Sequence, residues 1–179
     1  MKRILVLGVL VGGFGLSFTA TATAAQFLYK QAAGKQLVLH DSVRVPVGTA
    51  TVYFQGGAVV SAGGLNEFIP YCALVVDRLS ETPQRVPAGS YRIVKPFPYE
   101  DEDANLGSVN KFVGTRGWGF YKVGVNTEYY FMTRLKLAST TTPKLLYLDC
   151  GSLWDYSIGG HISVAEFKNA VGPWLSLAP

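Results

Sequence analysis

Short apolar runs rich in valine, isoleucine, tyrosine and phenylalanine recur along this chain, with turn residues between them. The runs are KQLVLH, TATVYFQ, YCALVVD, SYRIVK, NKFVG, WGFYKV, EYYFMTRLKL and KLLYLDC. The connectors QGG, SAGG, TPQ, KPFP, ASTTTP and CGS supply residues that let the backbone reverse. Runs of this length and composition, bounded in this way, predict β-strands.

Alternation within two of these runs separates a core face from a polar face, as is typical of a half-buried strand. In residues 49–55 the expected core positions are Ala50, Val52 and Phe54, opposite Thr51, Tyr53 and Gln55. In residues 128–137 the expected core positions are Tyr129, Phe131, Thr133, Leu135 and Leu137, opposite Tyr130, Met132, Arg134 and Lys136.

One segment near the C-terminus breaks the β pattern and predicts a short helix near residues 163–171. Ser163 and Glu166 have the spacing of a capping box, and Gly172 with Pro173 forms a stop signal. The expected apolar face consists of Val164, Phe167 and Val171. Together these elements predict a mainly β fold, an antiparallel β-sandwich or barrel-like domain whose sheet is closed at one end or side by a short C-terminal helix.

The first residues have the three parts of a secretory signal peptide. The charged start MKR precedes the apolar stretch ILVLGVLVGGFGLSF, and the small-residue segment TATATAA follows. An A-x-A match predicts cleavage just before Ala25 or Gln26. Glycines interrupt the apolar stretch, which is shorter than the roughly 20 residues of a spanning helix, so an uncleaved anchor is disfavoured. We expect a signal peptide at 1–25 and a single β-rich domain at 26–179, periplasmic or secreted.

The chain has two cysteines, Cys72 and Cys150. Cysteines of an exported protein usually pair because the compartment is oxidising, so we expect a disulfide between them. Two buried free thiols are the alternative. A catalytic dithiol is disfavoured because the C-x-x-C spacing of many redox-active pairs is missing.

The charge balance argues against nucleic acid as a partner. The chain has 16 lysines and arginines against 12 aspartates and glutamates, and two of the basic residues belong to the expected signal peptide. Clustered basic residues on an aromatic face, the footprint of nucleic-acid binding, are not evident. The sequence likewise gives no nucleotide or cofactor signature, so we expect no cofactor.

Both histidines lie close in sequence to the residue types of a hydrolase. Asp41 and Ser42 follow His40 directly, and Asp149, Ser152 and Asp155 precede His161 within a short stretch. A Ser-His-Asp catalytic triad is defined by the spatial arrangement of its residues rather than by their adjacency in sequence. The chain also lacks the Gly-x-Ser-x-Gly motif that presents a nucleophilic serine in many hydrolases. Catalysis at His161 is therefore a minor alternative, and no catalytic residue is assigned.

One dense acidic run consists of Glu100, Asp101, Glu102 and Asp103. Calcium requires several oxygen ligands, so the run is a candidate metal site. It lacks the ligand spacing and glycine of an EF-hand loop. We favour a solvated loop between Pro98 and Gly107, because four adjacent carboxylates repel one another unless something neutralises them.

Aromatic residues crowd into residues 118–131, which contain the run WGFYKV and the start of the run EYYFMTRLKL. Such a cluster can line a pocket or form a partner surface. Trp118, Tyr130 and Trp174 are the candidate binding residues. We favour the alternative, in which alternating aromatic residues fill the core, because the strand pattern already places Tyr129 and Phe131 on the inward face.

Two segments share the pattern Arg-Val-Pro-x-Gly, at 44–48 and 85–89. A duplicated half could produce this similarity. Pro-x-Gly is also a common way to turn into a strand, and we interpret both segments as turns.

Four segments together resemble an uncharacterised family of small exported proteins of Gram-negative bacteria. They are VRVPVGTATVYFQGG, FIPYCALVV, YLDCGSLWD and HISVAEFKNAVGPWL. The resemblance implies a cell-envelope setting and places Cys72 and Cys150 in recurring blocks, which is consistent with their pairing. It implies no activity and no site residue.

The leading functional hypothesis is a non-enzymatic interaction or structural module of the cell envelope, with an envelope protein as its possible partner. It is favoured because the expected disulfide-bonded β-domain lacks a clustered set of catalytic groups. A small-molecule carrier with an apolar pocket is the first alternative. A hydrolase that uses His161 with Asp149 or Asp155 and Ser152 is the second.

Overall fold

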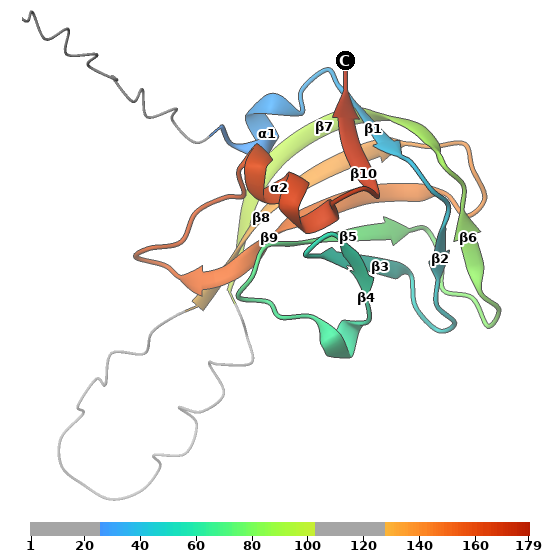
Figure 1. Cartoon of the computed structure of the whole chain (residues 1–179), viewed down its shortest axis with the longest axis horizontal. Coiled ribbons are helices and arrows are strands. Elements are labelled where there is room, and N and C mark those ends of the chain that lie inside the picture. Colours follow the sequence, from blue (N-terminus) through green and yellow to red (C-terminus); the bar gives the residue numbers. More distant parts are fainter. Residues whose placement is uncertain (1–25, 103–127) are drawn as a thin grey trace, which may run out of the picture.

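The fold is seen in a computed structural model, which describes residues 26–102 and 128–179. An eight-stranded antiparallel sheet of order β10-β1-β7-β8-β9-β5-β3-β4 curls into a half-barrel, and β2 pairs with β6 in a two-stranded sheet beside it (Figure 1). The expected mainly β fold with one short C-terminal helix is confirmed.

The elements are short at the edges of the large sheet and long in its middle. The central strands are β5 (Tyr71–Val76), β7 (Gly89–Glu102), β8 (Glu128–Ala138) and β9 (Leu145–Asp155). The other strands are β1 (Gln36–Leu39), β2 (Val43–Val45), β3 (Thr51–Gln55), β4 (Ala58–Val60), β6 (Gln84–Val86) and β10 (Leu175–Ala178). The helices are α1 (Leu28–Gln31), a 3-10 turn η1 (Ala62–Gly64) and α2 (Val164–Val171). The predicted runs NKFVG and WGFYKV lie outside the described residues.

The strand alternation divides the sheet into two faces. The inner face, covered by α1 and α2, carries Val52 and Phe54 of β3 and Leu135 of β8, all at most 2% exposed. The outer face carries a smaller buried cluster of Tyr71, Ala73 and Met132. The core positions predicted for 49–55 and 128–137 are therefore confirmed, except that Ala50 and Tyr129 are only half-buried.

Helix α2 begins at the predicted capping box. The Ser163 side chain accepts a hydrogen bond from the Glu166 backbone, and the Glu166 carboxylate accepts one from the Ser163 backbone. Phe167 and Val171 are buried against the inner face, while the third predicted apolar residue, Val164, is half-buried. The helix packs on β3, β5 and β10 and thereby closes one side of the sheet.

Cys72 and Cys150 form the expected disulfide, which staples β5 to β9 from the inner face. The two residues are directly opposite each other in the strand register, with Cα atoms 4.1 Å apart. Both are fully buried. The alternative of two free thiols is thereby excluded.

The two Arg-Val-Pro segments are strand partners rather than only turns. Val43 of β2 pairs with Val86 of β6, and Arg44 pairs with Arg85. Val45 and Val86 are fully buried, so the valines of the shared pattern belong to the inner core. The sequence similarity therefore reflects two short strands that cover the core in the same way.

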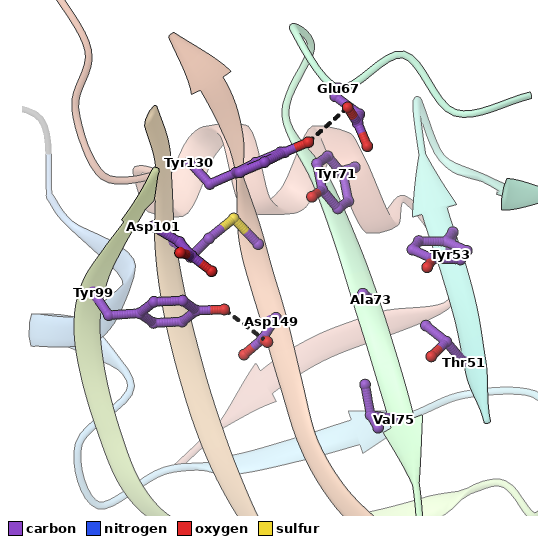
Figure 2. A pocket seen from close by; sticks show the side chains of 11 residues that line it. Thr51, Tyr53, Glu67, Tyr71, Ala73, Val75, Tyr99, Asp101, Tyr130 and Asp149 are labelled. Carbon is purple, nitrogen blue, oxygen red and sulfur yellow. Dashed lines mark hydrogen bonds between the residues drawn. The ribbon is translucent and has the colours of Figure 1, made fainter. Parts of the chain in front are cut away.

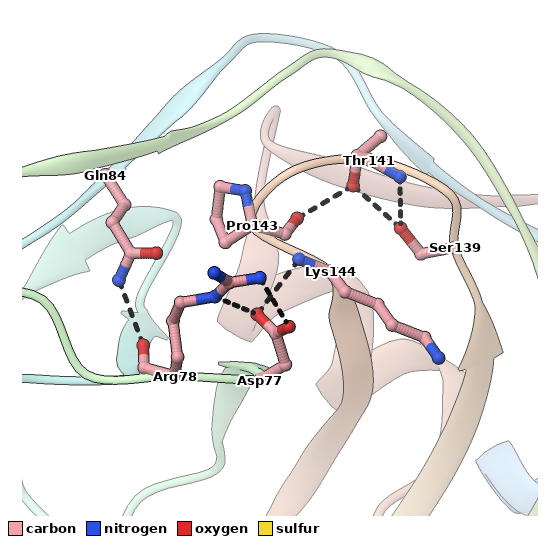
Figure 3. Close-up of polar contacts among 7 residues, drawn as sticks. All are labelled: Asp77, Arg78, Gln84, Ser139, Thr141, Pro143 and Lys144. Carbon is pink, nitrogen blue, oxygen red and sulfur yellow. Dashed lines mark hydrogen bonds and ion pairs between the residues drawn. The ribbon is translucent and has the colours of Figure 1, made fainter.

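Polar contacts fix the connectors at one end of the central strands (Figure 3). Asp77, just after β5, forms an ion pair with Arg78 at 3.2 Å and accepts a hydrogen bond from the Lys144 backbone at 3.1 Å. The Gln84 side chain donates to the Arg78 carbonyl at 3.0 Å. These contacts connect Lys144, which precedes β9, and Gln84, the first residue of β6, to the segment that follows β5.

Strand β7 corrects two sequence expectations, because it runs through the KPFP segment and on to Glu102 without a turn or loop. The prolines are tolerated because this half of β7 pairs only with β8, and a strand without a second neighbour does not need every backbone N–H. The acidic run is therefore strand as far as Glu102, and Asp103 lies outside the described residues.

In the part of the chain that the structure describes, no helix has both the length and the apolar character needed to cross a membrane.

Candidate functional site

A pocket of about 310 Å³ lies on the outer face of the large sheet, on the side away from α2 (Figure 2). Five strands and the segment before β5 contribute to it. The lining residues are Thr51 and Tyr53 from β3; Tyr71, Ala73 and Val75 from β5; Tyr99 and Asp101 from β7; Tyr130 and Met132 from β8; Asp149 from β9; and Glu67. A pocket of this size suits a small ligand or a single side chain of a partner.

The pocket exists because a small residue stands among large ones. Ala73 pairs with Tyr53 on one neighbouring strand and with Asp149 on the other. Side chains directly opposite in an antiparallel sheet are close neighbours, so a methyl group at Ala73 leaves space that a larger side chain would fill. The tyrosine rings of the neighbouring strands form walls around this low floor (Figure 2).

An ion pair forms one side of the site. Arg134 Nε donates to Asp149 Oδ1 at 2.7 Å, and Arg134 Nη2 donates to Oδ2 at 2.6 Å. The Tyr99 hydroxyl donates to the same Oδ2 at 3.0 Å. The guanidinium carbon also lies 3.9 Å from the ring centroid of Tyr147, within cation–π range. This bidentate geometry fixes the direction of the Asp149 carboxylate, and it raises the pKa of Arg134.

The opposite wall is built on the segment between β4 and β5. The Tyr130 hydroxyl donates to Glu67 Oε2 at 2.7 Å. The Gln55 side chain donates to the carbonyls of Asn66 at 2.7 Å and Ile69 at 2.9 Å, and it accepts from the Asn66 backbone at 3.0 Å. These three bonds hold the segment that carries Glu67 against the end of β3.

The electrostatic character of the pocket is negative. Glu67, Asp101 and Asp149 line it, and none of the described lining residues is a lysine, arginine or histidine. Burial, and then the Asp149 carboxylate, raises the pKa of Tyr99 to about 12. Burial, and then Glu67, raises the pKa of Tyr71. The phenols therefore remain neutral hydrogen-bonding groups at physiological pH.

The predicted aromatic binding residues do not form one surface. Tyr130 lines the pocket on the outer face. Trp174 packs against the inner core, with its ring centroid 6.3 Å from that of Phe54. Trp118 lies outside the described residues.

The acidic run divides between the two faces because consecutive strand residues point to opposite sides. Asp101 lines the pocket, whereas Glu100 lies 3.8 Å from His161 Nε2. Glu102 belongs to β7. Within residues 26–102 and 128–179, no group of three or more histidine, cysteine, aspartate or glutamate side chains could hold a metal ion.

The residues of the hydrolase hypothesis each have other partners. The His161 ring packs edge-on against Phe131, with centroids 5.9 Å apart, and approaches Glu100. Ser152 accepts a hydrogen bond from the Trp154 indole at 2.7 Å, and Asp155 accepts one from the Ser157 backbone at 2.8 Å. Asp149 is held by Arg134 on the outer face.

Most pocket residues were not singled out from the sequence. Alternation had nevertheless placed Tyr53 and Thr51 opposite the core positions of β3, and Tyr130 and Met132 opposite those of β8. The signal was therefore a polar, tyrosine-rich face on strands whose other face is core.

No known protein family, curated protein or solved structure matches this chain. The site is therefore interpreted from its own geometry.

Proposed function

We propose that this chain is an exported cell-envelope protein that acts by binding, as a non-enzymatic interaction module, and that the outer-face pocket is its binding site. The observation that carries the proposal is the pocket itself, where tyrosines from four strands surround a small floor. Tyrosine combines a large apolar ring with a polar tip and loses little conformational entropy on binding, so such clusters favour recognition.

Export to the periplasm or the cell surface is supported by two independent features. The N-terminal sequence has the parts of a signal peptide, and the buried Cys72–Cys150 disulfide suits an oxidising compartment. The resemblance to small exported proteins of Gram-negative bacteria supports the same setting.

A binding role is favoured over the two alternatives by what surrounds the relevant residues. The inner face of the half-barrel is filled by side chains from α1, α2 and β10, which is unfavourable for a carrier with an apolar pocket inside the sheet. His161, Ser152 and Asp149 contact other residues instead of one another, which is unfavourable for a hydrolase.

Site-specific photo-crosslinking in the producing cell tests the proposal. A photoreactive amino acid replaces Thr51 at the pocket wall, and in a control it replaces Val94, an exposed residue of β7 that does not line the pocket. Adducts are identified by mass spectrometry. We expect a defined adduct from position 51 and none from position 94.

Variants that fill the pocket provide a second test of the proposed site. In Ala73→Phe the added ring occupies the floor, and the adduct at position 51 should disappear. Ala73→Leu, a smaller change on the same floor, covers the case in which the phenylalanine variant does not fold. Identical adducts from positions 51 and 94, or an adduct unaffected by both fillings, would overturn the proposed site.

A further inference from the structure

The outer face already holds one organic cation, the guanidinium of Arg134. Its charge is bound by Asp149, and its flat surface lies 3.9 Å from the ring centroid of Tyr147 and 5.0 Å from that of Tyr99. Carboxylate pairing and aromatic faces thus act on the same cation. Both attractions are expected to strengthen at a partly buried site, where water screens them less.

The pocket beside Arg134 offers the same two groups, and none of its described lining residues is a cation. Tyr53 and Tyr71 present rings whose centroids are 6.4 Å apart, and Glu67 and Asp101 supply carboxylates. Neither of these two carboxylates forms an ion pair with a lysine or arginine in the part of the chain that the structure describes. Both are on exposed residues, so a ligand entering from solvent can reach them.

The electrostatics select the sign of the ligand. Three carboxylates line the pocket, and among the residues that the structure describes only Asp149 has a cationic partner. The carboxylates of Glu67 and Asp101 would repel an anionic ligand, and a neutral ligand would gain no charge attraction from them. A cation with an apolar body gains from the carboxylates and from the tyrosine faces together, which is how aromatic cages recognise ammonium groups.

We propose that the outer-face pocket binds an organic cation of the alkylammonium class, between the rings of Tyr53 and Tyr71 and the carboxylates of Glu67 and Asp101. This inference rests on the proposed function and specifies its ligand. Two sources share the chemistry, a small free amine and a lysine side chain of a partner protein. The mass of the adduct at position 51 distinguishes them.

Calorimetric titration with choline tests the class of ligand, with dimethylbutanol as its uncharged isostere and maltose as a neutral sugar. The purified, oxidised chain should bind choline and neither neutral compound. The double variant Glu67→Gln, Asp101→Asn should weaken choline binding roughly 10-fold. The matched control Asp41→Asn, Glu81→Gln removes the same charge at exposed positions outside the pocket and should leave the affinity unchanged.

The outcomes separate the ligand class from the site. If choline fails to bind, or if either neutral compound binds as tightly, the cation proposal is wrong, even where the adduct at position 51 still depends on an open pocket. Equal weakening in the two double variants would also overturn it, because the effect would then be one of net charge alone. If the adduct at position 51 forms whether or not the pocket is filled, the proposed binding site is wrong. The crosslinking experiment detects this outcome without choline.

Discussion

Arg134 and Asp149 are directly opposite each other in the register of β8 and β9, and they form a bidentate ion pair on the outer face. The side chains are 27% and 10% exposed, so the pair is partly shielded from water. Tyr99 from β7 bonds to the same carboxylate. Three consecutive strands are thus connected through Asp149, which makes this residue the support of one pocket wall.

Asp149→Asn is expected to destabilise the fold by about 1–3 kcal/mol, because it leaves the Arg134 guanidinium without its counter-charge in a partly buried place. Urea unfolding measures the change. Asp77→Asn is the matched control, since Asp77 pairs with Arg78 in an exposed position and should matter less. An equal or larger effect of the control would contradict the assigned importance of Asp149.

Stability should fall as the pH rises from about 10 through about 12. Burial and the Asp149 carboxylate raise the pKa of Tyr99 from 10.0 to about 12. A raised pKa in the folded state favours the neutral phenol, so its contribution to stability is complete below pH 10 and is lost as the pH passes the folded value. Absorbance titration of the phenolates should show Tyr99 ionising earlier in Asp149→Asn, and an unchanged titration would argue against this coupling.

Ser163→Ala should lower stability by about 1 kcal/mol, because it removes the side-chain acceptor at the start of α2. Ser61→Ala provides a comparison, since Ser61 is the N-cap of η1 and makes no side-chain capping bond. Thermal melting of the two variants should differ. Equal melting temperatures would show that the capping box adds no stability.

Reduction of the Cys72–Cys150 disulfide should lower the free energy of unfolding by about 4 kcal/mol, since its 78-residue separation closes a long loop in the unfolded chain. Both cysteines are fully buried, so a reductant should act only once the chain opens in urea. Denaturation with and without dithiothreitol measures the difference. The double variant Cys72→Ala, Cys150→Ala should not respond to the reductant, and a response there would point to another cause.

The sequence predicted the faces of the strands better than it predicted their neighbours. Alternation identified Val52 and Phe54 as core and Tyr53 as polar-facing, because the period of a strand is local. The contact between Tyr99 and Asp149 spans 50 positions and depends on the strand order, which alternation does not encode. The pocket therefore could not be predicted from the sequence, although alternation assigns several of its residues to the correct face.

Short strands and proline account for the remaining differences. β2, β6 and β4 contain three residues each, too few for alternation to be recognised. Pro96 and Pro98 indicated a turn, because proline interrupts a strand that is paired on both sides. In the fold they lie where β7 pairs with β8 alone, and this one-sided pairing cannot be read from the local sequence.

The most direct test of the account is a nuclear magnetic resonance titration of the oxidised chain, with carbon-13 in its tyrosine rings, by choline. The rings of Tyr53, Tyr71, Tyr99 and Tyr130 line the pocket. Tyr91 belongs to the inner core, where its hydroxyl donates to the Pro87 carbonyl at 2.6 Å, and it serves as the internal reference. We predict saturable shifts of the pocket rings with Tyr91 unchanged. Pocket rings that do not shift, or that shift no more than Tyr91, would contradict the account.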